Sequence, residues 1–117
     1  MTKKKTNLYD LESYQYDAAL HSTTLEIFDI VMAEADPESR RNYNTIRIKK
    51  SDLSFIVPND EEIVDELTTS LYDRMDEYNS LHTSESGRKV QLDMYNLNAD
   101  PIRVDGSTIY VRVARFN

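Results

Sequence analysis

Residues 102–113, IRVDGSTIYVRV, contain two alternating apolar runs that flank an Asp-Gly pair, and this pattern is the strongest local indication of the fold. Asp105-Gly106 is typical of a type I′ β-hairpin turn, which requires positive φ at both central residues. A two-residue loop at this point pairs Val104 with Ser107. Because side chains alternate along a strand, five apolar residues then share one face of the hairpin. They are Ile102, Val104, Ile109, Val111 and Val113.

The opposite face of this hairpin carries Arg103, Tyr110 and Arg112, which alternate with the apolar set. A second basic segment covers residues 36–50, where five bases and two acids give a local net charge of +3. The five bases are Arg40, Arg41, Arg47, Lys49 and Lys50. Arginine interleaved with an aromatic is typical of nucleic-acid-binding surfaces, and both residue types are also enriched at protein–protein hot spots. Cross-strand pairing on a solvated sheet face is the third interpretation.

The helical pattern is clearest over residues 60–81. Asn59 is expected to cap this helix, and the acids at positions 60, 61 and 62 favour its first turn because of the helix dipole. Arg74 falls within the apolar stripe, so its side chain must extend outward or meet an acid. Helical spacing aligns that stripe as Ile63, Leu67, Leu71, Met75, Tyr78 and Leu81.

Acidic residues are concentrated on the same helix. Residues 60–77 hold eight acids and one base, a local net charge of −7 that equals the formal charge of the whole chain. A rigid array of carboxylates can compete with DNA, which presents one negative charge per roughly 1.7 Å of axis, for a basic cleft. A solvated helix face is the other interpretation. The candidate partner-binding residues are Glu62, Asp65, Glu66, Asp73, Asp76 and Glu77.

The N-terminal third of the chain is expected to be helical. Residues 23–26, Thr-Thr-Leu-Glu, match a capping box, which predicts a second helix that begins there and ends at Ala35. The β-branched content of residues 23–35 makes a strand the alternative. Asn7 is expected to cap a first helix that places on one side Leu8, Leu11 and Ala18.

Three further segments alternate in the manner of half-buried strands: residues 45–49, 53–57 and 90–94. The first two are expected to pair as a hairpin. The order of elements predicts an α+β fold, a small antiparallel sheet with two or three helices packed on one face. A length of 117 residues predicts a single domain, 1–117, in which residues 1–6 form a basic N-terminal tail.

Composition indicates a protein of a reducing compartment. The chain has no Cys, whereas small secreted domains usually depend on disulfides. No apolar stretch follows the charged start, so no signal peptide is expected, and charges interrupt the apolar-rich residues 25–35, so no membrane span is expected. We therefore expect a cytoplasmic protein, in the host cytoplasm or in a particle if the chain is viral. Short, highly charged chains without Cys are common in viruses and mobile elements.

Residue types that carry catalysis are scarce. His21 and His82 match no metal-ligand spacing and are expected at the surface or at helix ends. Gly87 and Gly106 are the only glycines, which excludes Gly-rich phosphate loops. We therefore expect no enzyme, and we predict no catalytic residue, no metal site and no cofactor.

These observations favour a non-enzymatic protein-binding module, an inhibitor or accessory factor that presents the acidic helix face, in its sharper form as a nucleic-acid mimic. The first alternative is a structural subunit of a larger assembly, such as a virion. The second is direct nucleic-acid binding through residues 40–50 and the final hairpin, which the acidic net charge disfavours. A macromolecular protein partner is thus expected, with no membrane and with the oligomeric state left open.

Overall fold

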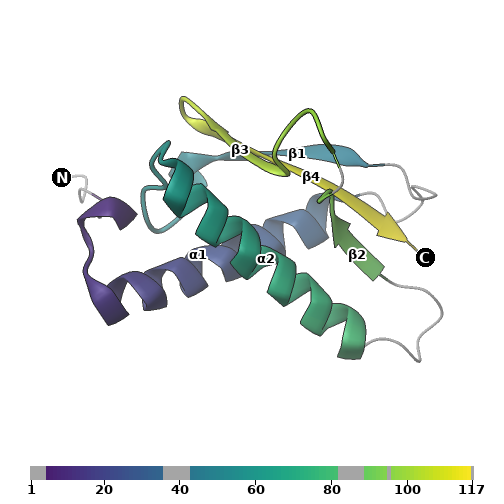
Figure 1. The fold of residues 1–117 in the computed structure, drawn as a ribbon, viewed down its shortest axis with the longest axis horizontal. Coiled ribbons are helices and arrows are strands. Elements are labelled where there is room, and N and C mark those ends of the chain that lie inside the picture. The colour runs from purple at the N-terminus through teal and green to yellow at the C-terminus, as the bar shows by residue number, and fades with distance from the viewer. Residues whose placement is uncertain (1–4, 36–42, 82–88, 95, 117) are drawn as a thin grey trace.

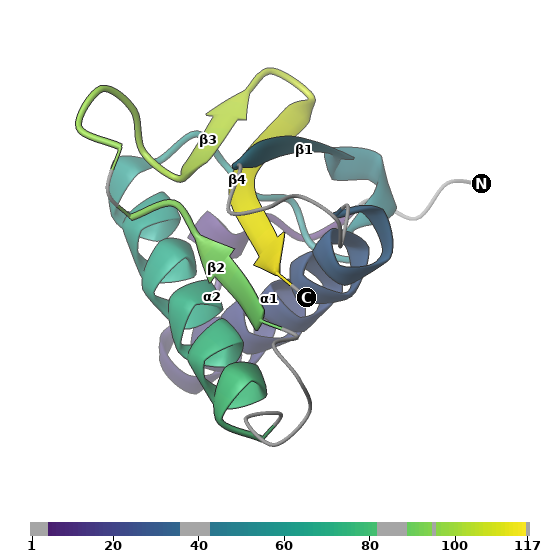
Figure 2. The same ribbon diagram turned by 90° about the vertical axis from the view of Figure 1, so that its right-hand side faces the viewer.

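The computed structural model describes residues 5–35, 43–81, 89–94 and 96–116. Both long helices lie on one side of a four-stranded antiparallel sheet, so the predicted α+β architecture is confirmed (Figures 1 and 2). In chain order the elements are the 3₁₀ helix η1 (Leu8–Asp10), α1 (Ser13–Glu34), β1 (Asn44–Lys49), the 3₁₀ helix η2 (Lys50–Asp52), α2 (Glu61–Leu81), β2 (Lys89–Leu92), β3 (Ile102–Asp105) and β4 (Thr108–Phe116).

Strand β4, nine residues long, is the centre of the sheet. β1 pairs with one edge of β4, while β3 and β2 pair with successive parts of its other edge. β3 lies opposite residues 108–111, and β2 lies opposite residues 113–116. One strand therefore joins the sheet segments contributed by both halves of the chain.

The final hairpin forms with the predicted inward face but with a different register. Asp105 pairs with Thr108, so the loop consists of Gly106 and Ser107, and the predicted pairing of Val104 with Ser107 is wrong. Gly106 has φ of 58° whereas Ser107 has negative φ, which is the pattern of a type II′ turn rather than the predicted I′ turn. The pairing shifts by two residues along the partner strand. A shift of two leaves every side chain on its predicted face.

The predicted hairpin between residues 45–49 and 53–57 is wrong, because β1 pairs along its length with β4. Residues 53–57 instead run beside the N-terminal segment. The Ile56 amide donates to the Thr6 carbonyl at 2.9 Å, and the Leu8 amide donates to the Ile56 carbonyl at 3.0 Å. Alternation shows which face a residue takes, and it does not identify the partner strand.

The predicted N-terminal tail, residues 1–6, is described only from Lys5 onward. Lys5 Nζ donates to the backbone carbonyls of Ser51 and Leu53, both at 2.6 Å. These bonds tie the start of the described chain to the segment that follows β1.

Helix α1 is continuous through the residues that matched a capping box, so the predicted helix start at residue 23 is wrong. The Thr23 and Thr24 hydroxyls donate back to the carbonyls of Ala19 and Leu20, both at 2.8 Å, and both threonines are buried. Hydroxyls that bond the carbonyl four residues earlier are compatible with a helix interior. Helix rather than strand is confirmed for residues 23–34.

The cap predicted at Asn7 belongs to a shorter element. Its side chain accepts a hydrogen bond from the Tyr9 amide at 2.9 Å and so caps η1, a single turn, whereas α1 begins at Ser13. Leu8 is fully buried, but Ala18 is exposed. The apolar side predicted for one long helix is therefore divided between two elements.

Helix α2 confirms the prediction for residues 60–81 with two corrections. Asp60 Oδ1 accepts from the Ile63 amide at 3.1 Å, so Asp60 rather than Asn59 caps the helix. Leu81, assigned to the apolar stripe, is 72% exposed. Arg74 pairs with Glu77 at 3.6 Å. The rest of the predicted stripe is buried or partly buried: Ile63, Leu67, Leu71, Met75 and Tyr78.

The hydrophobic core fills the space between the two helices and the inner face of the sheet. Helix α1 contributes Phe28, whose ring lies 5.6 Å from the ring of Tyr78 on α2. Every strand contributes the apolar half of its alternation: Ile46, Ile48, Val90, Leu92, Ile102, Val104, Ile109, Val111 and Val113. The polar half of that alternation therefore lies on the outer face of the sheet. Both helices lie on the opposite side of the sheet (Figure 2).

Candidate functional site

The outer face of the sheet brings together two segments that are far apart in sequence. Tyr110 on β4 lies directly opposite Arg47 on β1 and directly opposite Arg103 on β3. Directly opposed residues in an antiparallel pair have Cβ atoms about 5 Å apart. Across three adjacent strands the sheet thus presents one row, Arg47–Tyr110–Arg103, that we call the Arg-Tyr-Arg row.

Within this row the arginine on β3 stacks on the tyrosine. The guanidinium carbon of Arg103 lies 4.8 Å from the centroid of the Tyr110 ring. Arg103 and Arg47 are exposed, and Tyr110 is partly buried. A cation over an aromatic face is attracted by the ring quadrupole, and the contact orders a long side chain that would otherwise be mobile.

The next row of the outer face is anchored by a buried carboxylate. The Arg112 Nε lies 2.9 Å from Asp93 Oδ2, and the Asp93 side chain is only 7% exposed. The Asp93 amide also donates to the Arg112 carbonyl at 2.9 Å. The Arg112 guanidinium carbon lies 5.9 Å from the ring centroid of Tyr43. The buried Asp93 carboxylate requires a cationic partner, and Arg112 supplies it. This ion pair holds Arg112 in place and largely neutralises its charge.

A shallow depression of about 200 Å³ lies beside both rows. Its walls include Thr45 and Arg112 from one row, Arg103 and Tyr110 from the other, and Pro101 and Asp100 from the loop before β3. The carboxylate of Asp100 reduces the positive potential at this side of the face. Three cations of the face, Arg47, Lys49 and Arg103, form no ion pair with any residue in the described ranges.

The structure extends the surface that the sequence predicts. Arg103, Tyr110 and Arg112 share one face, as expected for the final hairpin, and β1 adds Arg47 and Lys49 from the basic segment. Arg40 and Arg41 lie outside the described residues, and Lys50 belongs to η2. The sequence did not identify Asp93, Tyr43 and Thr45. The β1–β4 pairing that brings the last two to this face is a long-range contact without a local signal.

The acidic candidates lie on the other side of the molecule. All six are exposed on α2: Glu62, Asp65, Glu66, Asp73, Asp76 and Glu77. Two of them are engaged within the chain, since Glu66 accepts from the Tyr16 hydroxyl and Glu77 pairs with Arg74. An open depression of about 420 Å³ runs beside Leu20, Asp65 and Asp73.

Tyr16 on α1 is the titratable group most altered by this surface. Burial raises the pKa of its hydroxyl well above the usual value, and the hydrogen bond to Glu66 raises it further. The carboxylates of Glu62 and Asp17 act in the same direction, because they disfavour a second negative charge nearby. Tyr16 therefore remains a hydrogen-bond donor to the acidic helix over the physiological pH range.

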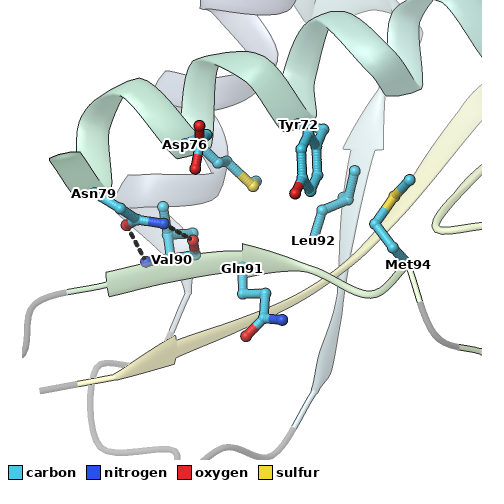
Figure 3. Close-up of a pocket in the computed structure, with 8 residues that line it drawn as sticks. Tyr72, Asp76, Asn79, Val90, Gln91, Leu92 and Met94 are labelled. Atoms are coloured by element: carbon cyan, nitrogen blue, oxygen red, sulfur yellow. Dashed lines mark hydrogen bonds between the residues drawn. The ribbon is translucent and has the colours of Figure 1, made fainter.

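A third depression, of about 170 Å³, lies between α2 and the edge strand β2 (Figure 3). The Asn79 side chain bonds twice to Val90: its Nδ2 donates to the carbonyl at 2.8 Å, and its Oδ1 accepts from the amide at 3.0 Å. Tyr72 and Met94 flank the opening and are 46% exposed each. Asn79 therefore occupies the backbone groups of β2 that an added strand would use.

Other site types have no support in the part of the chain that the structure describes. His21 is exposed within α1 rather than at a helix end, and His82 lies outside the described residues. No group of three or more His, Cys, Asp and Glu side chains there could hold a metal ion. Nor does any helix in those ranges have the length and apolar character to cross a membrane. Comparison of the chain with protein-family models, curated proteins and solved structures finds no match.

Proposed function

We propose that this chain is a non-enzymatic binding module and that its docking surface for a negatively charged macromolecule is the outer face of the sheet. The observation that carries the proposal is the Arg-Tyr-Arg row, in which Tyr110 lies between Arg47 and Arg103 on three neighbouring strands. Arginine and tyrosine are among the residues enriched at binding hot spots. Strand pairing rather than a loop fixes their backbone positions, and the Arg103 side chain is also held against the Tyr110 ring, which lowers the entropy lost on binding.

The distribution of charge supports the same surface. The net charge of −7 disfavours acidic partners at long range, but its source is α2, on the far side of the sheet. At physiological ionic strength the screening length is about 8 Å, which is less than the roughly 10 Å that separates packed layers. A partner at the outer face therefore meets chiefly local charges, the cations Arg47, Lys49 and Arg103 and the carboxylates Asp100 and Asp105, of which Asp105 shares a row with Lys49 across Thr108.

A second candidate function is the binding of a basic partner protein through the acidic face of α2, with nucleic-acid mimicry as its sharp form. The observation in its favour is that all six predicted carboxylates are exposed along one helix. The engagement of Glu66 and Glu77 within the chain weakens it, because those carboxylates already have donors.

Binding of defined polyions to the purified full chain separates the two candidates. The probes are poly-glutamate and single-stranded DNA as polyanions and poly-lysine as a polycation, at about 50 mM salt, where weak electrostatic binding is retained. The double substitution Arg47→Gln with Arg103→Gln is expected to weaken polyanion binding about tenfold. Gln15→Glu, an exposed site on α1, adds one unit of negative charge outside the sheet and is the control.

Asp65→Asn with Asp73→Asn and Asp76→Asn is the complementary variant. The outer-face proposal predicts that this triple variant retains polyanion binding. If the wild-type chain bound poly-lysine and the triple variant did not, the result would favour the acidic helix instead. Failure of every polyanion to bind at low salt would overturn the outer-face proposal.

A further inference from the structure

We infer that the partner of the outer face is a single-stranded nucleic acid, with a base stacked at Arg103 and Tyr110 and phosphates held by Arg47 and Lys49. This inference rests on the proposed function, since it uses the same surface. It adds the chemical class of the partner.

The stacking platform is the first argument. Arg103 lies over the Tyr110 ring at 4.8 Å, and its exposed guanidinium is a planar, weakly hydrated surface. Bases that are not paired stack both on aromatic rings and on guanidinium planes. A base on the outer side of Arg103 would extend the existing stack, and a base that displaced Arg103 would stack on the ring itself.

A repeated pairing of arginine with tyrosine is the second argument. Arg112 lies 5.9 Å from the ring centroid of Tyr43, one row further along β4 from the Arg103–Tyr110 pair. Rows of one face are separated by two residues of strand, about 7 Å. Two aromatic and guanidinium pairs along one strand direction suit a chain of successive bases. A poly-acidic peptide would pair with the cations but would make no stacking contact with the tyrosine rings.

The shape of the face favours a single strand over a duplex. The major groove of DNA admits a protruding helix or two-stranded ribbon, whereas the Arg-Tyr-Arg row lies across the face of a sheet beside a shallow depression. Single strands bring their bases to such a surface directly. With Arg47 and Lys49 as the phosphate-contacting cations, the slope of log affinity against log salt should be about −1.4.

Fluorescence anisotropy with the full chain tests the inference. The probes are labelled oligouridylate and oligothymidylate of about ten nucleotides, within the range that one small domain covers. Tyr110→Leu is expected to weaken binding about ten- to a hundredfold without a change in salt slope, because it removes stacking and no charge. Arg47→Gln is expected to reduce the salt slope by about 0.7. Tyr14→Leu, at a 78% exposed position on α1, is the matched control.

Further outcomes decide the result. Tyr110→Phe keeps the ring and is expected to bind within about twofold of the wild type, which separates stacking from any folding defect of Tyr110→Leu. Binding of single strands that Tyr110→Leu leaves unchanged, or equal affinity for a duplex of the same length, would overturn the inference. Binding of poly-glutamate without binding of either oligonucleotide would overturn it as well, while leaving the proposed function intact. Loss of all polyanion binding would overturn both.

Discussion

At the scale of single residues, hydrogen bonds between side chains join the elements, and each contributes little to stability by itself. Thr24 Oγ1 donates to Ser70 Oγ at 2.8 Å between the two helices, and the Glu26 carboxylate accepts from the Ser54 amide and hydroxyl. Tyr16 adds a third link by donating to Glu66 across the same helix pair. Each such bond contributes about 1 kcal/mol to stability, so their value lies in fixing how α1 and α2 are aligned.

Tyr16→Phe tests the third link. The raised pKa of the Tyr16 hydroxyl means that the folded state favours the protonated form. Its contribution is therefore fully present below the ordinary tyrosine pKa of about 10 and is lost as pH rises through the raised value. We expect Tyr16→Phe to lower the free energy of unfolding by about 1 kcal/mol near neutral pH, with the difference shrinking above about pH 10. Urea denaturation at several pH values measures this.

Tyr14→Phe is the control, because Tyr14 is exposed on the same helix and makes no side-chain hydrogen bond in the described part of the chain. An equal effect of the two substitutions, or a difference that grew with pH, would contradict the role assigned to Tyr16.

At the scale of elements, the edge strand β2 shows how a side chain can complete a sheet. β2 has four residues and pairs only with β4 among the described strands. Its outer edge is met by Asn79, whose amide reproduces the donor and acceptor of a neighbouring strand (Figure 3). The Met94 amide donates a hydrogen bond to the Leu92 carbonyl at 2.9 Å. Together these bonds occupy the Val90 amide and carbonyl and the Leu92 carbonyl on the exposed edge, and they oppose pairing with another chain.

Asn79→Leu keeps the side-chain size and removes both bonds to Val90. We expect the free energy of unfolding to fall by about 2 kcal/mol, because two partly buried backbone groups lose their partners. We also expect concentration-dependent association, since the edge of β2 becomes available to a second chain. Urea denaturation and sedimentation velocity measure the two effects. Asn98→Leu, at an exposed loop position, is the control, and equal behaviour of both variants would refute the edge assignment.

At the scale of the whole molecule, the two layers carry opposite charge. The outer face of the sheet presents Arg47, Lys49 and Arg103, whereas the acids of α2 lie on the helical side. Residues 60–77 hold a local net charge of −7, and like charges on one helix repel one another. The outer face of the sheet, which suits anions, therefore lies apart from α2, which is the source of the negative net charge.

This arrangement predicts that salt stabilises the fold. Raising NaCl from about 20 to 500 mM should increase the free energy of unfolding by about 1 kcal/mol, because screening weakens repulsion along α2. Asp73→Asn should flatten this dependence, and Asp10→Asn, outside α2, should leave it nearly unchanged. Chemical denaturation in urea at each salt concentration provides the measurement. A loss of stability with added salt would show that attraction between charges outweighs the repulsion.

The features that could be predicted from the amino-acid sequence are those that depend on local periodicity. The inward face of residues 102–113 was predictable because strand side chains alternate, and it survived a two-residue error in register. The apolar stripe and acidic face of α2 were predictable because helical spacing sets both. Arg103, Tyr110 and Arg112 shared a face for the same reason. The failed capping box at residues 23–26 shows the limit, because a buried helix interior overrides a local start signal.

Which elements pack against one another became known only from the three-dimensional fold. Alternation in β1 showed its faces but not its partner, so the sequence paired it with residues 53–57 whereas the structure pairs it with β4. That single long-range choice puts Arg47 beside Tyr110 and creates the Arg-Tyr-Arg row. Asp93 likewise acquires its role only when β2 docks on β4 and brings its carboxylate to Arg112. Periodicity is a property of neighbours in the chain, whereas strand partners are selected by the packing of the whole core.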